Sequence, residues 1–161
     1  MDRLHAWLVA NRPEELPAAI SHGDFRLGNA LHGPDGAVLA VLDWELCTLG
    51  DPRADLTYLL RAWVQPDEPL VSSIEAPTRA GGFFTRAEVL SRYESRTGTT
   101  LTDLDYWTAF HAWRSASISE GVYRRYVDGG MGERPDDVEV YARSVELSAS
   151  AGLRAAGLDV G

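Results

Sequence analysis

Apolar residues recur at helical spacing along most of the chain, and this pattern predicts a series of helices. The clearest stripe is formed by Leu56, Leu59, Leu60 and Trp63, which lie three and four residues apart and share one helix face. The predicted helices span residues 2–11, 52–64, 85–96, 102–127 and 135–156. Loops are predicted at residues 65–84, with a short turn at 70–74, and at 131–134.

Two short apolar runs, residues 30–32 and 37–42, flank the sequence Gly33-Pro34-Asp35-Gly36, which is a strong turn signal. A turn between two such runs predicts a β-hairpin, and a further short strand is expected within residues 16–21. The predicted fold class is therefore mostly α with a small β-hairpin (α+β). Residues 1–161 are long enough for a single domain.

The composition limits the classes of function. The chain has 161 residues and a formal net charge of −9, which argues against nonspecific binding to nucleic acid because that binding needs a basic surface. The single cysteine, Cys47, cannot form an internal disulfide and fits a reducing cytoplasm. No apolar run reaches about 18 residues, so we expect no membrane-spanning segment. A cytoplasmic protein without nucleic-acid or membrane partners is expected.

The polar stretch of residues 21–29, with the sequence SHGDFRLGN, carries the candidate chemistry together with the loop of residues 42–45. The hairpin is expected to bring Asn29, just before its first strand, close to Asp43, just after its second. Carboxylate and amide oxygens are the hard ligands that Mg²⁺ prefers, and no thiolate or histidine cluster indicates zinc or iron. Asp24 could instead take a proton from a substrate hydroxyl.

The pattern His22-x-Asp24-x-x-x-x-Asn29, followed by Asp43, resembles the catalytic loop and metal-binding aspartate of the aminoglycoside phosphotransferase (APH/choline kinase-like) family, relatives of the protein kinases. The resemblance implies that Asp24 orients the attacking hydroxyl and that Asn29 and Asp43 hold Mg²⁺ against ATP. It assigns His22 and Arg26 to the same catalytic loop, and His22 is expected to hold that loop by hydrogen bonding.

Further motifs point to one branch of this family. Residues 42–46, 49–56 and 120–123, together with Trp113, are similar to the phosphotransferase-like domains associated with acyl-CoA dehydrogenases. The resemblance covers about residues 20–127. It implies the C-terminal lobe of a protein-kinase-like fold, in which residues 52–156 form a helical substrate subdomain.

Several roles stay open on the sequence alone. Arg26 could meet a substrate anion or the transferred phosphate, or pair with a nearby carboxylate. Glu45 could be a further metal ligand, a substrate contact or a solvated acid. Asp43 follows a strand that we expect to be buried, where a carboxylate needs a metal ion or a partner. Packing or bracing roles are assigned to Trp44, Cys47, Asp51 and Asp55.

The helix of residues 102–127 is the candidate substrate wall. It carries His111 and Arg114, which lie three residues apart and therefore share a face, and also Glu120. The alternative is that these residues belong to an ordinary core stripe and a solvated face.

The chain contains no lysine: all 15 of its Lys and Arg residues are arginines. A kinase-like fold holds the ATP phosphates with a lysine on its N-terminal lobe, beneath a glycine-rich loop. Neither feature precedes Ser21, and the residues before it contain no glycine. We therefore expect a C-terminal lobe whose N-terminal nucleotide lobe is missing, with little activity alone. Its uncovered apolar surface is expected to bind the missing lobe or to form a homo-oligomer.

Three functions compete at this point. The first is an ATP-dependent phosphotransferase that acts on a hydroxyl of a small molecule, either an aminoglycoside or a hydroxylated acyl or other metabolite. The second is a metal-dependent hydrolase, which Asn29 disfavours because an amide suits a highly charged two-metal cluster poorly. The third is a non-catalytic remnant that binds a partner.

Overall fold

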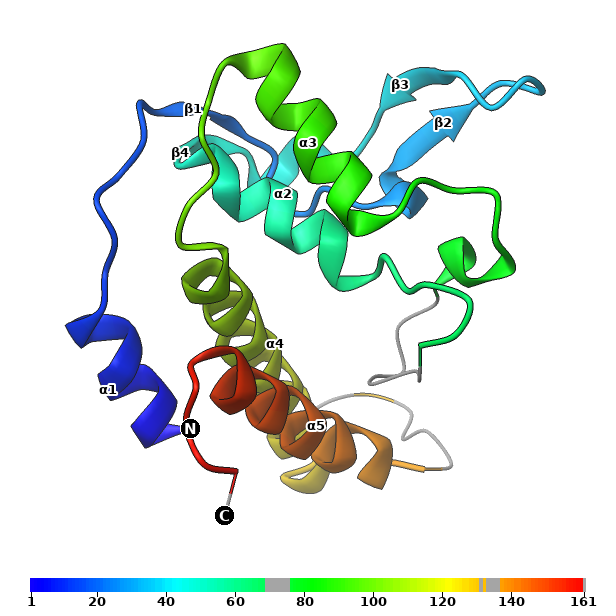
Figure 1. The fold of residues 1–161 in the computed structure, drawn as a ribbon. Coiled ribbons are helices and arrows are strands. Elements are labelled where there is room, and N and C mark those ends of the chain that lie inside the picture. The colour runs from blue at the N-terminus through cyan, green and yellow to red at the C-terminus, as the bar shows by residue number, and fades with distance from the viewer. Residues whose placement is uncertain (69–75, 131, 133–136, 161) are drawn as a thin grey trace. The chain divides into compact units, whose positions relative to one another are not determined.

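The computed structural model describes residues 1–68, 76–130, 132 and 137–160. Helices predominate, as predicted, and the strands form small antiparallel sheets (Figure 1). The α-helices are α1 (Asp2–Ala10), α2 (Pro52–Arg61), α3 (Arg86–Thr97), α4 (Leu104–Val127) and α5 (Glu139–Ala155). The strands are β1 (Ala19–Ser21), β2 (Ala30–His32), β3 (Val38–Val41) and β4 (Thr48–Gly50), and 3₁₀ turns occupy Leu27–Asn29, Trp44–Leu46 and Pro77–Ala80.

Local capping explains where helices α2 and α3 begin. The Asp51 side chain accepts a hydrogen bond from the backbone N–H of Arg53, and Pro52 takes the first helical position. At α3, Thr85 and Glu88 form the reciprocal capping box predicted from the sequence. The predicted turn at 70–74 and the predicted helix start at 135 lie outside the described residues, as does most of the predicted loop 131–134.

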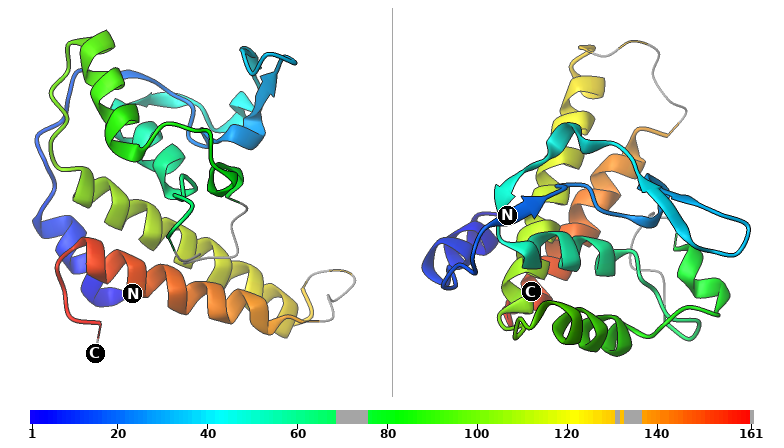
Figure 2. Two further views of the ribbon diagram at one scale, coloured as in Figure 1. Left: turned by 45° about the vertical axis from the view of Figure 1, so that its right-hand side comes forward. Right: turned by 90° about the horizontal axis from the view of Figure 1, so that it is seen from above.

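Two antiparallel ribbons frame the polar stretch of residues 21–29. Strands β2 and β3 form the predicted hairpin, with Ala30 opposite Val41. Strand β1 pairs with β4, which the sequence analysis did not predict, and Ser21 lies opposite Thr48. Figure 2 shows both ribbons from above. The chain thus enters the polar stretch from β1 and, after the hairpin and the loop of residues 42–47, returns beside its starting point.

The hairpin is exposed, which corrects the prediction that Asp43 follows a buried strand. Val38 and Leu39 are 59% and 64% exposed, and Leu31 on the partner strand is 51% exposed. A two-stranded ribbon buries its side chains only when another layer covers it, and among the described residues no such layer covers these three.

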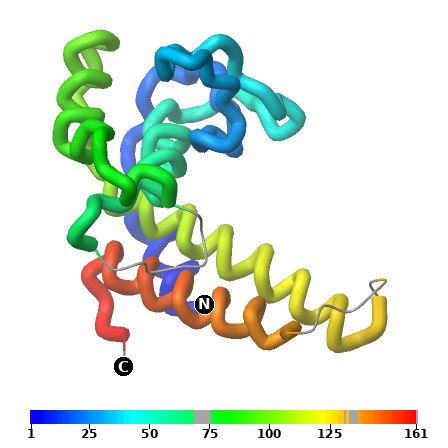
Figure 3. Tube along the Cα trace, turned by 90° about the vertical axis from the view of Figure 1, so that its right-hand side faces the viewer, coloured from blue at the N-terminus to red at the C-terminus, as the bar shows by residue number. Residues whose placement is uncertain are grey.

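Contacts group the chain into two compact units. One comprises residues 1–13 and the described residues from 105 onward, and its core contains Leu4, Leu8 and Ala109. In this unit α4 and α5 run side by side (Figure 3). The other unit comprises the described residues of 14–104 and contains both ribbons, α2 and α3. The single-domain organisation predicted from chain length stays a prediction.

In the part of the chain that the structure describes, no helix is both long and apolar enough to cross a membrane.

Gly152 of α5 lies where the packing leaves no room for a side chain. A Cβ atom there would stand 2.4 Å from Cδ2 of the fully buried Leu4 and 3.0 Å from Cβ of Ala112. We expect Gly152→Ala to lower the free energy of unfolding by about 1–3 kcal/mol through overpacking. Gly121 of α4 has open space around its Cα, so Gly121→Ala is the matched control. It should raise the free energy of unfolding by about 0.5–1 kcal/mol. Urea unfolding compares the two, and equal stabilities would contradict this account.

Candidate functional site

Helix α2 holds the backbone at the start of the candidate catalytic loop. Asp55 accepts hydrogen bonds from the backbone N–H groups of His22 and Gly23, the second at 2.9 Å. Gly23 has φ +82°, and a Cβ atom there would stand 2.7 Å from the carbonyl oxygen of Leu46. A side chain at this position would therefore be both strained and in collision. Asp55 braces the loop, as the sequence analysis predicted.

His22 is buried and uses both of its ring nitrogens to fix the loop. It is 2% exposed, its Nδ1 accepts the backbone N–H of Asp24 at 3.2 Å, and its Nε2 lies 2.8 Å from the carbonyl oxygen of Leu42. Since Nδ1 accepts, the geometry assigns the ring proton to Nε2, which donates to Leu42. Trp44 packs on this ring with centroids 4.7 Å apart. These contacts agree with the hydrogen-bonding role predicted for His22.

The carboxylate of Asp24 is held from several directions. Its Oδ1 accepts the phenol of Tyr58 at 2.5 Å, and its Oδ2 accepts the side-chain amide of Asn29 at 2.9 Å. Nε of Arg26 lies 3.5 Å from the same Oδ2, which corresponds to one of the two roles left open for Arg26; a contact with a substrate anion or phosphate stays a prediction. Burial raises the pKa of Asp24, but the hydrogen bonds from Tyr58 and Asn29 and the charge of Arg26 outweigh it and leave the pKa below its ordinary value. Asp24 is therefore ionised at neutral pH.

Asn29 is 5% exposed, and its side-chain nitrogen donates to both the backbone and the carboxylate oxygen of Asp24. Its amide oxygen is thus the atom left to bind a cation. The N–H of Leu42 donates to the carbonyl oxygen of Asn29 at 2.8 Å, so the ladder of the hairpin continues one pair beyond the strands. Asp43 follows Leu42 directly. The structure brings Asp24 into contact with Asn29 and places Asp43 at the same end of the hairpin.

Asp43 is exposed and adopts a left-handed backbone conformation, with φ +67° and ψ +55°. This conformation is uncommon outside glycine, and such residues cluster at functional sites. Glu45, in the 3₁₀ turn that follows, is also exposed. Cys47, which the sequence analysis interprets as an inert small hydrophobic residue, is exposed as well. Asp43 and Glu45 both present carboxylates to solvent.

The donors around Asp43 fit magnesium better than zinc. Within the described residues, no group of three or more His, Cys, Asp and Glu side chains could hold a metal ion. The amide oxygen of Asn29 and the carboxylate of Asp43 are hard ligands. Mg²⁺ is typically held by one or two such protein groups and completes its shell with phosphate oxygens and water.

A cavity of about 790 Å³ opens beside the catalytic loop, and the sequence analysis did not predict it. Its lining includes the cationic residues Arg26 and Arg61 and also Tyr58. The guanidinium of Arg61 lies over the ring of Tyr58, 5.0 Å from its centroid. The rest of the wall is mainly apolar and includes Leu59, Trp63, Pro77 and Phe83. One feature of the sequence could have identified Tyr58 as a site residue: it lies three residues after Asp55, so both side chains are on the same face of α2.

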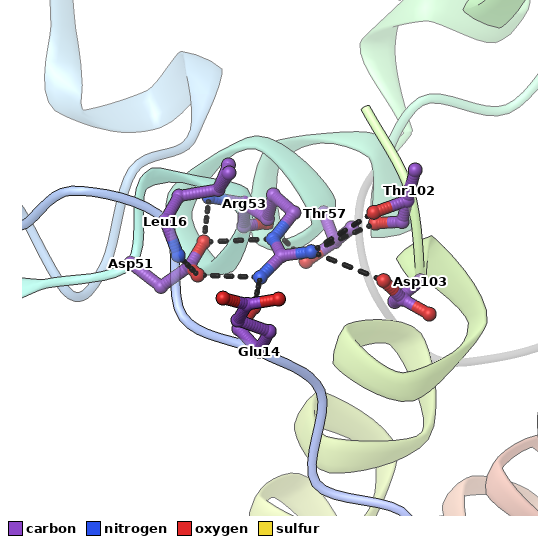
Figure 4. A network of polar contacts seen from close by, with 7 residues as sticks. All are labelled: Glu14, Leu16, Asp51, Arg53, Thr57, Thr102 and Asp103. Carbon is purple, nitrogen blue, oxygen red and sulfur yellow. Dashed lines mark hydrogen bonds and ion pairs between the residues drawn. The ribbon is translucent and has the colours of Figure 1, made fainter. Parts of the chain in front are cut away.

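A buried ion pair fixes the start of α2 (Figure 4). Arg53 is 1% exposed and contacts the carboxylate of Asp51 at 2.7 and 3.0 Å. It also donates to the carbonyl oxygens of Glu14 and Thr102 and lies 3.3 Å from Asp103. The start of α2 is thereby tied to the segments before β1 and before α4. Burial raises the pKa of Asp51, but the hydrogen bonds and charge of Arg53 outweigh it, so this pKa is lowered.

The candidate substrate residues of α4 lie in the other compact unit. His111 is buried, Arg114 is half-buried, and Glu120 forms an exposed ion pair with Arg124 at 2.7 Å. Their role as a substrate wall stays a prediction.

Comparison with known proteins places this loop in context. The sequence profile of the phosphotransferase enzyme family (APH) matches residues 1–90, which include the whole polar stretch and the hairpin. The chain belongs to this family. The resemblance inferred from His22, Asp24, Asn29 and Asp43 is thereby confirmed.

Members of the APH family similar to this chain include parts of much longer proteins. Mouse acyl-CoA dehydrogenase family member 11 is 34% identical over 159 residues, which cover 96% of this chain and 20% of that protein. Mouse acyl-CoA dehydrogenase family member 10 is 38% identical over 133 residues, which cover 80% of this chain and 12% of that protein. The chain thus spans a fifth or less of the length of these relatives.

A solved structure gives the same assignment. A crystal structure described as an aminoglycoside phosphotransferase from Ralstonia eutropha matches with a TM-score of 0.74 and 33% identity. The match covers 97% of this chain and 48% of that one. Together with the APH profile, it supports a phosphotransferase-like kinase fold.

Proposed function

We propose that the chain is the C-terminal lobe of an ATP-dependent phosphotransferase that acts on a hydroxyl of a small molecule. The observation that carries the proposal is the carboxylate of Asp24, which is ionised and oriented by Asn29 at the end of the hairpin that presents Asp43. The assignment to the APH family supports it.

In this proposal Asp24 accepts the hydrogen bond of the acceptor hydroxyl and takes its proton as that oxygen bonds to the γ-phosphorus of ATP. The bond between this phosphorus and the β–γ bridging oxygen breaks, and ADP leaves. Its lowered pKa suits late proton transfer, because phosphoryl transfer passes through a loose transition state in which the hydroxyl is hardly activated. The amide oxygen of Asn29 and the carboxylate of Asp43 would hold Mg²⁺. When bound, the ion neutralises charge on the β- and γ-phosphates. In this proposal the chain contributes to catalysis by positioning the reacting groups and by holding the charges that stabilise the transition state.

The nucleotide lobe is proposed to dock on the two ribbons. Ile20 and Leu49, which lie opposite each other on β1 and β4, are 73% and 75% exposed. On the hairpin, Leu31 and Leu39 are 51% and 64% exposed. Exposed apolar side chains on both ribbons are consistent with surfaces that another layer covers. Without that layer we propose weak ATP binding and little turnover.

The cavity beside Tyr58 is proposed to receive the acceptor. Its mainly apolar wall and the guanidinium groups of Arg26 and Arg61 favour an acceptor with an apolar part and a negative charge. A hydroxylated acyl compound meets this description, whereas a polycationic aminoglycoside does not. The names of the acyl-CoA dehydrogenase relatives agree with this preference.

The test uses the natural full-length polypeptide that carries this chain. We expect Mg²⁺-dependent transfer of phosphate from [γ-³²P]ATP to hydroxylated acids in an acceptor panel. Asp43→Ala should raise the Mg²⁺ concentration needed for half-maximal rate by about tenfold or more, because even the loss of a residue that only orients a metal ligand typically lowers metal affinity 10–100-fold. Asp67→Ala, which removes an exposed carboxylate elsewhere, is the control. Divalent-ion-dependent hydrolysis without nucleotide would instead favour a metal-dependent hydrolase.

A further inference from the structure

The contact between Tyr58 and Asp24 has no counterpart in the sequence motif. Among the described residues, hydrogen bonds to the Asp24 carboxylate come from Tyr58, Asn29 and Arg26. Asn29 and Arg26 belong to the same loop as Asp24, so they move with it. Tyr58 is the donor that comes from a separate element, helix α2.

Helix α2 is a rigid support for such a contact. Its first turn is fixed by the buried pair of Asp51 and Arg53, and the hydroxyl of Thr57 donates back to the carbonyl oxygen of Arg53 at 2.7 Å. One face of the helix presents Asp55 to the backbone of the loop and Tyr58 to its carboxylate. The helix thus holds the loop at two separate points.

We propose that Tyr58 is a positioning residue that fixes the orientation of the Asp24 carboxylate, which contacts two residues of the cavity wall, Tyr58 and Arg26. The proposal rests on the function proposed above. The phenol occupies one lone-pair direction of Oδ1, and since each carboxylate oxygen can accept two hydrogen bonds, an acceptor hydroxyl can bind beside it. Because the ring of Tyr58 also lines the cavity, the same side chain sets the carboxylate's orientation and the adjoining wall.

The first test detects the hydrogen bond between Tyr58 and Asp24 by NMR, without an activity measurement. The chain is labelled with ¹³C at the tyrosine Cζ atoms, and the Tyr58 signal is assigned by its disappearance in Tyr58→Phe. Asp24→Asn replaces the charged acceptor by a neutral one and should shift the Tyr58 signal. It should leave the signal of Tyr93, which lies on α3 and lines a different cavity, in place. An unmoved Tyr58 signal would overturn the contact.

The second test measures how loss of this hydrogen bond affects phosphate transfer by the natural full-length polypeptide. Tyr58→Phe removes only the hydroxyl and should lower kcat about tenfold or more, since hydrogen bonds to charged groups are among the stronger ones. The KM for ATP should stay within about twofold, because the nucleotide does not contact this side of the carboxylate in the proposed arrangement. Tyr93→Phe, the matched removal of a hydroxyl, should leave kcat unchanged.

The outcomes separate this proposal from the function on which it rests. If Asp24→Asn abolishes phosphate transfer but Tyr58→Phe leaves kcat unchanged, the function stands and the positioning role is overturned. If Asp24→Asn shifts the Tyr58 signal but does not slow phosphate transfer, the contact stands and the proposed function fails.

Discussion

Replacing Asp24 by Asn is expected to lower the rate of phosphate transfer by roughly 10²–10⁴-fold, the usual contribution of a positioned general base. Asn has nearly the same shape as Asp and still presents an oxygen to Tyr58, but its NH₂ group then faces the NH₂ group of Asn29. The hydrogen bonds of Asp55 and Asn29 to the loop backbone do not involve this side chain, so the loop should keep its conformation. What disappears is the negative charge that orients the acceptor hydroxyl and receives its proton. Initial rates with ATP, Mg²⁺ and a hydroxylated acid measure the effect in the natural full-length polypeptide.

Asp67→Asn is the matched control, because it makes the same chemical change at an exposed position. The thermal midpoint of Asp24→Asn should lie near that of the parent protein, which separates lost chemistry from lost folding. If Asp24→Asn transfers phosphate at the parental rate, Asp24 is not the base of the proposed mechanism.

Replacing Arg53 by Met is expected to lower the free energy of unfolding by about 3–5 kcal/mol, the usual cost of leaving one member of a buried ion pair without its partner. The carboxylate of Asp51 would stay buried without the guanidinium that contacts it at 2.7 Å. The carbonyl oxygens of Glu14 and Thr102 would lose their donor as well. Urea unfolding at pH 7 measures the loss.

The same pair predicts a dependence of stability on pH. Because the pKa of Asp51 is lowered in the folded protein, its contribution is fully present above the ordinary value of 3.8 and is lost as the pH falls through the folded-state pKa. Arg53→Met should therefore flatten the acid side of the stability profile. Arg143→Met, which breaks an exposed pair with Asp137, should have a much smaller effect at pH 7. Similar losses in the two variants would contradict the importance of burial.

The hairpin shows what the sequence could predict. The turn signal at residues 33–36 predicted that β2 and β3 pair, so the approach of Asn29 to Leu42, which precedes Asp43, followed from chain connectivity. The irregular register between Leu31 and His32 was not part of that prediction. The capping box at Thr85 was equally local, because both of its hydrogen bonds lie within one helical turn. Features set by neighbouring residues were the ones that the pattern predicted.

Features set by tertiary contacts were missed. Strand β4 spans only Thr48–Gly50, and a segment this short carries no alternation that distinguishes it from a loop. The role of Tyr58 depends on where α2 packs, which helical periodicity does not reveal. The apolar run before Asp43 was interpreted as a buried strand, but apolar residues indicate a face that can be covered, not whether a covering layer is present.

The orientation of the Asn29 side chain restricts what can stand at position 29. Its NH₂ group already donates to Asp24, so an aspartate there would set two negative carboxylates against each other at hydrogen-bonding distance. One of them would have to take up a proton, and either the base or the cation ligand would then be lost. Extra negative charge is usually assumed to strengthen a cation site, yet at this position repulsion makes the neutral amide the better choice.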